Sequence, residues 1–271
     1  MNSKLESSQW LHLFHEIAAE VRTQVLPYLG TAAGAVAVGV GAGGDQTMEV
    51  DRIAEMVVLN RLRELAAGGV NFSVLSEEEG HLNLGAEYPL VVVDPIDGSH
   101  NALRGLPMAA VMLSQLGGPT VDSTEVGVVH NLYSGERWHA MRGRGLHRNG
   151  EKVEPQPFDL SDLVVATSSR PESARLLAPR LAAGNRLRII GSVALSLVHT
   201  ATGGVDFYFS TQYARTFDIT SGWLMLQEVG GTATNLTGEP IAQLPVSLKP
   251  LTQLVCAAHP VAHQIALEML S

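Results

Sequence analysis

Several features are scarce or absent in this sequence of 271 residues. A single cysteine, Cys256, excludes an internal disulfide framework and a multi-cysteine zinc site. There are 18 Lys and Arg against 27 Asp and Glu, so no basic surplus indicates a nucleic-acid partner. No apolar run approaches the ~20 residues of a membrane span, and the first residues lack a secretion signal. We therefore expect a cytoplasmic protein with neither nucleic-acid nor membrane partners.

The overall composition indicates a folded globular protein. Hydrophobic residues make up 45% and charged residues only 17%, which excludes intrinsic disorder. The net charge of −9 is compatible with cation binding but is weak evidence by itself. The length allows one large domain or two of about 100–150 residues.

Apolar spacing predicts helices and strands in an α/β (α+β) arrangement. Helices are predicted at 7–29 and 47–68, with a mobile glycine-rich loop at 34–44 between them. Strands are predicted at 70–75, 90–93, 109–114, 125–130 and 137–141. After a connector at 153–162, strands at 163–167, 187–190, 205–209 and 254–257 alternate with helices at 172–183, 192–202, 219–229 and 261–270. We expect stacked layers in two halves, an N-terminal α+β half at 1–152 and a C-terminal α/β half at 153–271.

The glycine-rich segment matches the G-x-G-x-x-G pattern at Gly39–Gly44. A dinucleotide site needs this pattern between a strand and a helix, with an acidic residue about 20 positions later. Here no firm strand precedes it, Asp51 comes too early, and Glu64 lies on the outer face of the predicted helix. The pattern therefore favours a flexible loop over a nucleotide site.

A proline turn with two carboxylates follows the apolar strand at 90–93. Asp94 ends that strand, and Asp97, Gly98 and Ser99 come within the next five residues. An ordinary surface turn is the alternative, because Asp, Pro and Gly are common in turns. However, a carboxylate that ends a buried strand should be partly buried, and amides at the start of a following short helix attract phosphate. We therefore expect a phosphate-binding turn.

Three further acidic segments adjoin predicted strands or helices. Glu77–Glu79 follows a strand and by itself indicates a solvated loop. Asp51 comes one helical turn after the segment 44–47. Asp218 precedes an apolar helix, where the alternative role is an N-cap.

Convergence of these acids would require a compensating cation. Four carboxylates would meet within a few ångströms, namely Glu77, Asp94, Asp97 and Asp218. Two like charges ~4 Å apart repel by about 4 kcal/mol at an effective dielectric constant of 20. Arg215 is the one basic residue beside these motifs. Because oxygen ligands select Mg²⁺, Mn²⁺ or Ca²⁺ over zinc, we predict a divalent-metal site.

These motifs resemble those of the inositol monophosphatase family, in the lithium-sensitive, Mg²⁺-dependent phosphatase superfamily. The family pattern D-P-[IL]-D-G-[ST] matches Asp94–Ser99, and W-D-x-x-[AG]-[AG] corresponds to the segment at Asp218, with Phe217 in place of tryptophan. The resemblance extends from Asp45 to Gly231 and is closest to the archaeal-type branch, which often hydrolyses both inositol phosphate and fructose 1,6-bisphosphate. It implies a layered α/β/α/β/α sandwich.

The resemblance also implies a set of metal ligands and catalytic groups. One Mg²⁺ would be held by Glu77, Asp94 and the carbonyl of Ile96. A second would be held by Asp94, Asp97 and Asp218, and a third, weaker ion would use Glu77; Mn²⁺ could substitute. The implied catalytic residues are Asp51, Ser99 and Glu77, of which Ser99 and Asp51 activate the attacking water.

The implied substrate contacts combine backbone amides and side chains. The amides of Gly98 and Ser99 would take the phosphate. Thr211 stands where animal members carry an acidic residue that contacts inositol, so strict inositol specificity is not expected. Arg215 and, less directly, Arg170 could contact a second phosphate or a sugar hydroxyl; a surface charge is the alternative for both.

The expected function is therefore that of a Mg²⁺-dependent phosphomonoesterase for small polyol and sugar phosphates. Inositol 1-phosphate is the first expected substrate and fructose 1,6-bisphosphate the second, with a homodimer as the assembly that the resemblance implies. The alternatives are a nucleotide 3′-phosphatase of the 3′-phosphoadenosine 5′-phosphate type and a non-catalytic interaction role. Loss of turnover with an intact fold is expected for Asp97→Asn.

Overall fold

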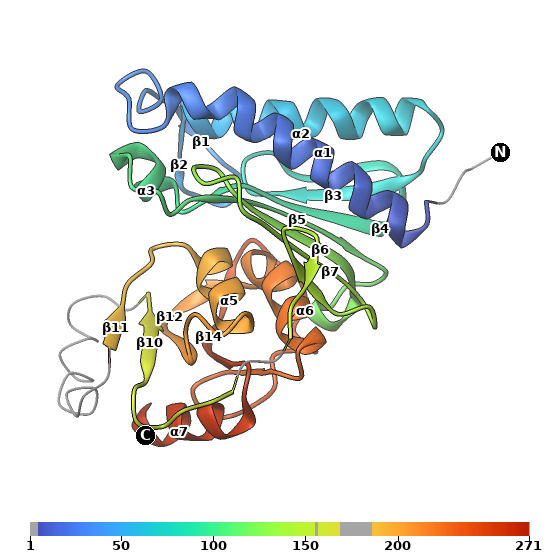
Figure 1. Cartoon of the computed structure of the whole chain (residues 1–271). Helices are drawn as coiled ribbons and strands as arrows, with labels where there is room; N and C mark the ends of the chain where they lie inside the picture. The colour runs from blue at the N-terminus through green and yellow to red at the C-terminus, as the bar shows by residue number, and fades with distance from the viewer. Residues whose placement is uncertain (1–4, 155–156, 169–185, 271) are drawn as a thin grey trace.

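The protein is layered, as the resemblance implies. The computed structural model describes residues 5–154, 157–168 and 186–270. Figure 1 shows α1 and α2 over a seven-stranded sheet, then α5 and α6, then a five-stranded sheet, and α7 on the outer face. The predicted α/β/α/β/α sandwich is confirmed. No helix of these described residues is both long and apolar enough to cross a membrane.

The outer helical layer consists of α1 (Ser7–Val25) and α2 (Glu49–Ala67), with a short 3-10 turn at Leu26–Tyr28. Both predicted helices are confirmed. Each buries one apolar stripe against the first sheet, as the i, i+3, i+4 spacing predicts. The helix α2 ends before Gly68, and Gly69 takes a positive φ of 95° that other residues rarely adopt.

The glycine-rich segment between these helices is an antiparallel hairpin of β1 (Ala37–Val40) and β2 (Gln46–Met48). The prediction of a loop throughout 34–44 was therefore wrong for β1. The alternation of valine and small residues in Val36–Val40 is a strand pattern that the glycine content concealed. Because Gly39–Gly44 joins a strand to a strand, the dinucleotide alternative is excluded.

The first sheet has the strand order β3-β4-β5-β6-β7-β8-β9. Its strands are β3 (Phe72–Ser76), β4 (Gly80–Asp97), β5 (Ala110–Leu116), β6 (Thr124–Asn131), β7 (Arg137–Met141), β8 (Leu146–Arg148) and β9 (Glu151–Lys152), with a 3-10 turn at Val121–Ser123. The predicted strand at 90–93 is the buried end of the much longer β4. The chain turns back within β4, so Leu75 pairs with both His81 and Val92.

The second sheet has the order β11-β10-β12-β14-β13. Its strands are β10 (Val164–Thr167), β11 (Arg186–Arg188), β12 (Phe207–Arg215), β13 (Thr232–Thr234) and β14 (Pro250–Ala257). The helices of this half are α5 (Val193–Ala201), α6 (Thr220–Glu228) and α7 (Pro260–Leu270), with a 3-10 turn at Thr216–Ile219. The alternation of strands and helices is confirmed, except that the predicted helix at 172–183 lies outside the described residues.

The middle helical layer joins the two sheets into one packed body. On α6, Ser221 donates a hydrogen bond to the carbonyl of Leu113 in β5 at 2.9 Å. A Cβ at Gly222 would lie 2.5 Å from the side chain of Leu197, so α5 and α6 meet too closely for a larger residue. The division of the chain at 152/153 stays a prediction.

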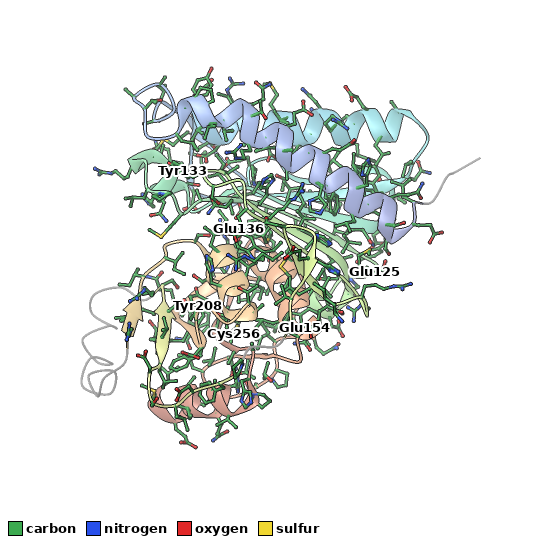
Figure 2. The ribbon with its side chains drawn as sticks, in the orientation of Figure 1. Glu125, Tyr133, Glu136, Glu154, Tyr208 and Cys256 are labelled. Carbon is green, nitrogen blue, oxygen red and sulfur yellow. The ribbon has the colours of Figure 1, made fainter. Side chains whose placement is uncertain are left out.

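The second sheet presents different side chains to its two faces. Figure 2 labels Tyr208 and Cys256, which pair across β12 and β14 and pack with the middle helices. Their neighbours Phe207 and Phe209 pack with α7 instead. This alternation places Cys256 in the core, as predicted, and burial raises the pKa of its thiol.

Candidate active site

An acidic cavity of about 490 Å³ lies where the end of β4 meets the start of α3 (Ser99–Arg104). The hairpin loop before β2 and the end of β12 complete its wall. Six carboxylates line it: Asp45, Asp51, Glu77, Glu78, Asp94 and Asp97. The structure therefore brings together acids that the sequence scatters over more than fifty positions.

Asp94 is the most enclosed of these acids. It ends the buried part of β4 and is 2% exposed, and its Oδ1 accepts a hydrogen bond from the Ile96 amide at 3.1 Å. Burial, and then the neighbouring charges of Glu77, Asp97 and Asp218, raise the pKa of Asp94 well above its usual range. A carboxylate in this position is held at high electrostatic cost, which a nearby cation would relieve.

Asp97 is held by the start of α5, 95 residues further along the chain. Its carboxylate accepts hydrogen bonds from the Ser192 hydroxyl, the Val193 amide at 3.1 Å and the Ala194 amide at 2.8 Å. Burial raises the pKa of Asp97, and these three bonds act in the opposite direction. Asp97→Asn would therefore weaken a contact with α5 as well as remove a charge, and the intact fold of this variant stays a prediction.

Asp51 and Ser99 form a pair beside these acids. Asp51 lies in the first turn of α2 and accepts a hydrogen bond from the Met48 amide at 3.0 Å. The Ser99 hydroxyl lies 3.3 Å from Asp51 Oδ1 and 2.9 Å from the carbonyl of Ile96. Burial raises the pKa of Asp51 to about 7, so this carboxyl exchanges its proton near neutral pH.

Glu77 and Asp218 face each other across Arg215. The Arg215 guanidinium lies 2.7 Å from Glu77 Oε1 and 3.0 Å from Asp218 Oδ2, and it packs over the ring of Phe217. Asp218 lies in the 3-10 turn before α6 and makes no capping bond to that helix, so the N-cap alternative was wrong. Its buried Oδ1 has no hydrogen-bond partner among the described residues.

Comparison with known proteins agrees with this geometry. A sequence profile of the inositol monophosphatase family matches residues 7–270. The chain belongs to the inositol monophosphatase family. It is 30% identical over 92% of its length to the fructose-1,6-bisphosphatase/inositol-1-monophosphatase of Thermococcus kodakarensis, of which it covers 93%. A crystal structure described as an inositol monophosphatase–fructose 1,6-bisphosphatase superposes with a TM-score of 0.85 at 26% identity, covering 96% of this chain and 99% of that one.

The chain is also similar to a larger protein of the same kind. It is 27% identical over 91% of its length to the bifunctional NADP phosphatase/NAD kinase of Methanococcus maripaludis, of which it covers 47%. These relatives identify the chain as a phosphatase, that is, a phosphoric monoester hydrolase. Phosphatases of the inositol monophosphatase family are in general metal-dependent.

The residues present fit a hard divalent cation. The potential ligands are carboxylate and carbonyl oxygens, which Mg²⁺ and Mn²⁺ prefer. The unpartnered Oδ1 of Asp218 and the costly burial of Asp94 both call for additional positive charge. Among the described residues, no three acidic, histidine or cysteine side chains are already arranged as a metal site.

The predicted substrate contacts differ in their placement. Arg215 and Gly98 line the cavity, and so do two residues that the sequence did not indicate, His100 and Gln212. Thr211 precedes Gln212 on β12, and its carbonyl accepts a hydrogen bond from Gln253 at 2.8 Å. Arg170 lies outside the described residues.

A buried carboxyl that the sequence analysis missed supports the turn that carries Glu77. Glu55 on α2 accepts hydrogen bonds from the Ser76 hydroxyl at 2.6 Å and the Glu79 amide at 3.2 Å. Burial raises the pKa of Glu55 to about 7. The available signal was its position four residues after Asp51, which places both carboxyls on one face of α2.

The raised pKa values predict that the metal-free protein loses stability as the pH rises from about 4.5 to about 7. In this window the folded protein binds more protons than the unfolded chain, so the free energy of unfolding falls with pH, by at most about 1.4 kcal/mol per pH unit for each such group. Glu55→Gln should reduce this slope in urea-unfolding series. Glu64→Gln, an exposed substitution on the same helix, is the control for the lost charge. A slope that Glu55→Gln leaves unchanged would contradict the expected contribution of Glu55.

Proposed function

We propose that this phosphatase hydrolyses small polyol and sugar phosphates with Mg²⁺, inositol 1-phosphate first and fructose 1,6-bisphosphate second. The supporting observation is the arrangement of the cavity, where the acids of β4 and the Asp51–Ser99 pair adjoin the start of α3. The names of the Thermococcus kodakarensis relative and of the similar crystal structure support the same substrates.

The proposed metal ligands are the carboxylates of Glu77, Asp94, Asp97 and Asp218 and the carbonyl of Ile96. Two Mg²⁺ ions and a third, weaker one would be held there, with Mn²⁺ able to substitute. Bound divalent ions supply two kinds of chemistry in such sites, a lowered pKa of water and neutralisation of charge on the phosphate oxygens. The crowding of buried acids supports the assignment, because burying each of these carboxylates is costly unless a positive charge compensates it.

The residues of the chain would position the reacting groups and move the proton. Ser99 has one hydroxyl hydrogen and two neighbouring acceptors, so it can donate to Asp51 while its oxygen accepts from the attacking water. Asp51 would then take up the proton. The amides of Gly98 and Ser99 would hold the phosphate. Because water is the nucleophile, no covalent bond between enzyme and phosphate forms.

A substrate panel tests this proposal. Purified enzyme is incubated with Mg²⁺ or Mn²⁺ and inositol 1-phosphate, fructose 1,6-bisphosphate, 3′-phosphoadenosine 5′-phosphate or NADP, and released phosphate is measured. We expect the highest kcat/KM for one of the first two substrates and loss of turnover with a chelator. A preference for either nucleotide, or turnover that survives chelation, would contradict the proposal.

NADP is included because one observation favours a nucleotide substrate. The similarity to the NADP phosphatase/NAD kinase extends over 91% of this chain. The second candidate function is therefore removal of a phosphate from a nucleotide. The proposed homodimer rests on the family resemblance, and sedimentation of the purified protein would test it. The proposed cytoplasmic location rests on the single cysteine and the sequence patterns described above.

A further inference from the structure

One basic side chain lies inside the acidic site. The guanidinium of Arg215 contacts carboxylates from three separate elements: Glu77 after β3 at 2.7 Å, Asp218 before α6 at 3.0 Å and Asp45 in the hairpin loop at 3.1 Å. Two of these acids are nearly enclosed, with side-chain exposures of 12% for Glu77 and 9% for Asp218. Solvent therefore screens the pairs with Glu77 and Asp218 weakly, whereas Asp45 is 78% exposed.

The chain is built to hold the guanidinium in this place. Arg215 packs over the ring of Phe217 with its central carbon 4.9 Å from the ring centroid. A Cβ at Gly43 would lie 2.9 Å from Arg215 Nη1, so the absence of a side chain there leaves room for the guanidinium. That loop is attached to the same acidic turn, because the Gly43 amide donates to the carbonyl of Glu77 at 2.8 Å.

Arg215 takes up carboxylate oxygens that a metal would need. Its contacts use Glu77 Oε1 and Asp218 Oδ2, while Asp218 Oδ1 has no partner among the described residues. A divalent cation bound by both acids would lie within a few ångströms of the guanidinium, and two cations at that separation repel each other.

We infer that Arg215 is an internal counter-ion that competes with the divalent cation for Glu77 and Asp218, and thereby lowers the affinity of the enzyme for its metal. The inference rests on the metal site of the proposed function. In the metal-free protein Arg215 holds these acids, and on metal binding it gives up at least Glu77. Arg215 is thus a residue that tunes metal affinity in addition to any contact it makes with substrate.

Direct measurement of Mn²⁺ binding tests the inference without relying on activity. Free Mn²⁺ is followed by electron paramagnetic resonance during titration of the metal-free, full-length protein. We expect Arg215→Gln to bind Mn²⁺ at least about tenfold more tightly than the wild type, which corresponds to about 1.4 kcal/mol. Damage to the site would weaken binding, so tighter binding cannot arise from a merely structural role.

Arg63→Gln is the matched control. Arg63 lies 3.6 Å from Glu79, two residues from Glu77, but its side chain is 51% exposed, so we expect less than about a twofold change. Mn²⁺ binding by Arg215→Gln that is equal to or weaker than that of the wild type would overturn the inference about Arg215 and leave the proposed metal site standing. Failure of the wild type to bind Mn²⁺ would instead overturn the proposed metal site.

A second variant decides the question if Arg215→Gln does not fold without metal, as judged by circular dichroism. Arg215→Lys keeps the charge but lacks the planar fork that reaches two acids at once. We therefore expect Arg215→Lys to fold and to bind Mn²⁺ more tightly than the wild type. The gain in affinity should be smaller than the gain expected for Arg215→Gln, which also removes the charge. Weaker binding by Arg215→Lys would overturn the inference and show that Arg215 organises the metal ligands.

Discussion

Asp94→Asn is expected to lower kcat by at least about 10³-fold and at the same time to stabilise the metal-free protein by about 1 kcal/mol or more. Activity falls because Asp94 is proposed to bind both metals that act on the phosphate. Stability rises because burial, and then the charges of Glu77, Asp97 and Asp218, raise the pKa of Asp94, so folding near neutral pH must either bury this charge or protonate it, and asparagine avoids that cost. The amide oxygen of asparagine can still accept from the Ile96 amide.

Two measurements check this pair of effects. Phosphate release is assayed with Mg²⁺, and the free energy of unfolding is measured in urea with a chelator present. Asp97→Asn is the matched control, because it also neutralises a buried acid of β4 but gives up a charged acceptor for the α5 amides. We expect no increase in the free energy of unfolding for Asp97→Asn. Retained turnover in Asp94→Asn would refute its role at the metals, and lower stability would refute the cost assigned to burying its carboxyl group among other acids.

Gly98→Ala is expected to destabilise the protein by about 3 kcal/mol and to reduce turnover strongly. Gly98 has a positive φ of 90°, and a Cβ there would lie 2.8 Å from the carbonyl oxygen of Met108 and 3.2 Å from the Ser192 side chain. Ser192 also donates a hydrogen bond to Asp97, so relief of the clash would displace the turn between β4 and α3. The amides proposed to hold the phosphate would then move.

A second glycine separates backbone strain from steric overlap. Gly150 has a similar φ of 89°, but no atom lies within 4 Å of the position that a Cβ would take there. Gly150→Ala should therefore cost only about 1 kcal/mol, the usual penalty for a left-handed alanine, and leave turnover unchanged. Equal losses of unfolding free energy in the two variants would show that the contact with Met108 is unimportant.

Much of the fold was predictable because it depends on local patterns. The apolar stripes of α1 and α2 and the buried end of β4 are read directly from residue spacing. Glycine hid the pattern of β1, and weakly patterned strands such as β8, β9 and β13 are too short for periodicity to reveal.

The sequence by itself determined the chemistry of the site. One short turn contains Asp94, Asp97, Gly98 and Ser99. Because these residues are contiguous in the sequence, the motif specifies both their side chains and the local backbone conformation that presents them. The order and spacing of the acidic motifs are also sufficient to identify the family. Such features survive in sequence because they depend on neighbours along the chain.

The tertiary structure alone decided the partners of those residues. Asp97 is held by amides of α5 far along the chain, Glu55 supports the turn of Glu77 from a different element, and Arg215 reaches Asp45, which lies 170 positions away in the sequence. The sequence showed Arg215 beside Asp218 but could not show which acids it meets. The physical reason is that hydrogen bonds and ion pairs between distant segments depend on how the helical and sheet layers pack, and that packing has no signature in any one stretch of residues.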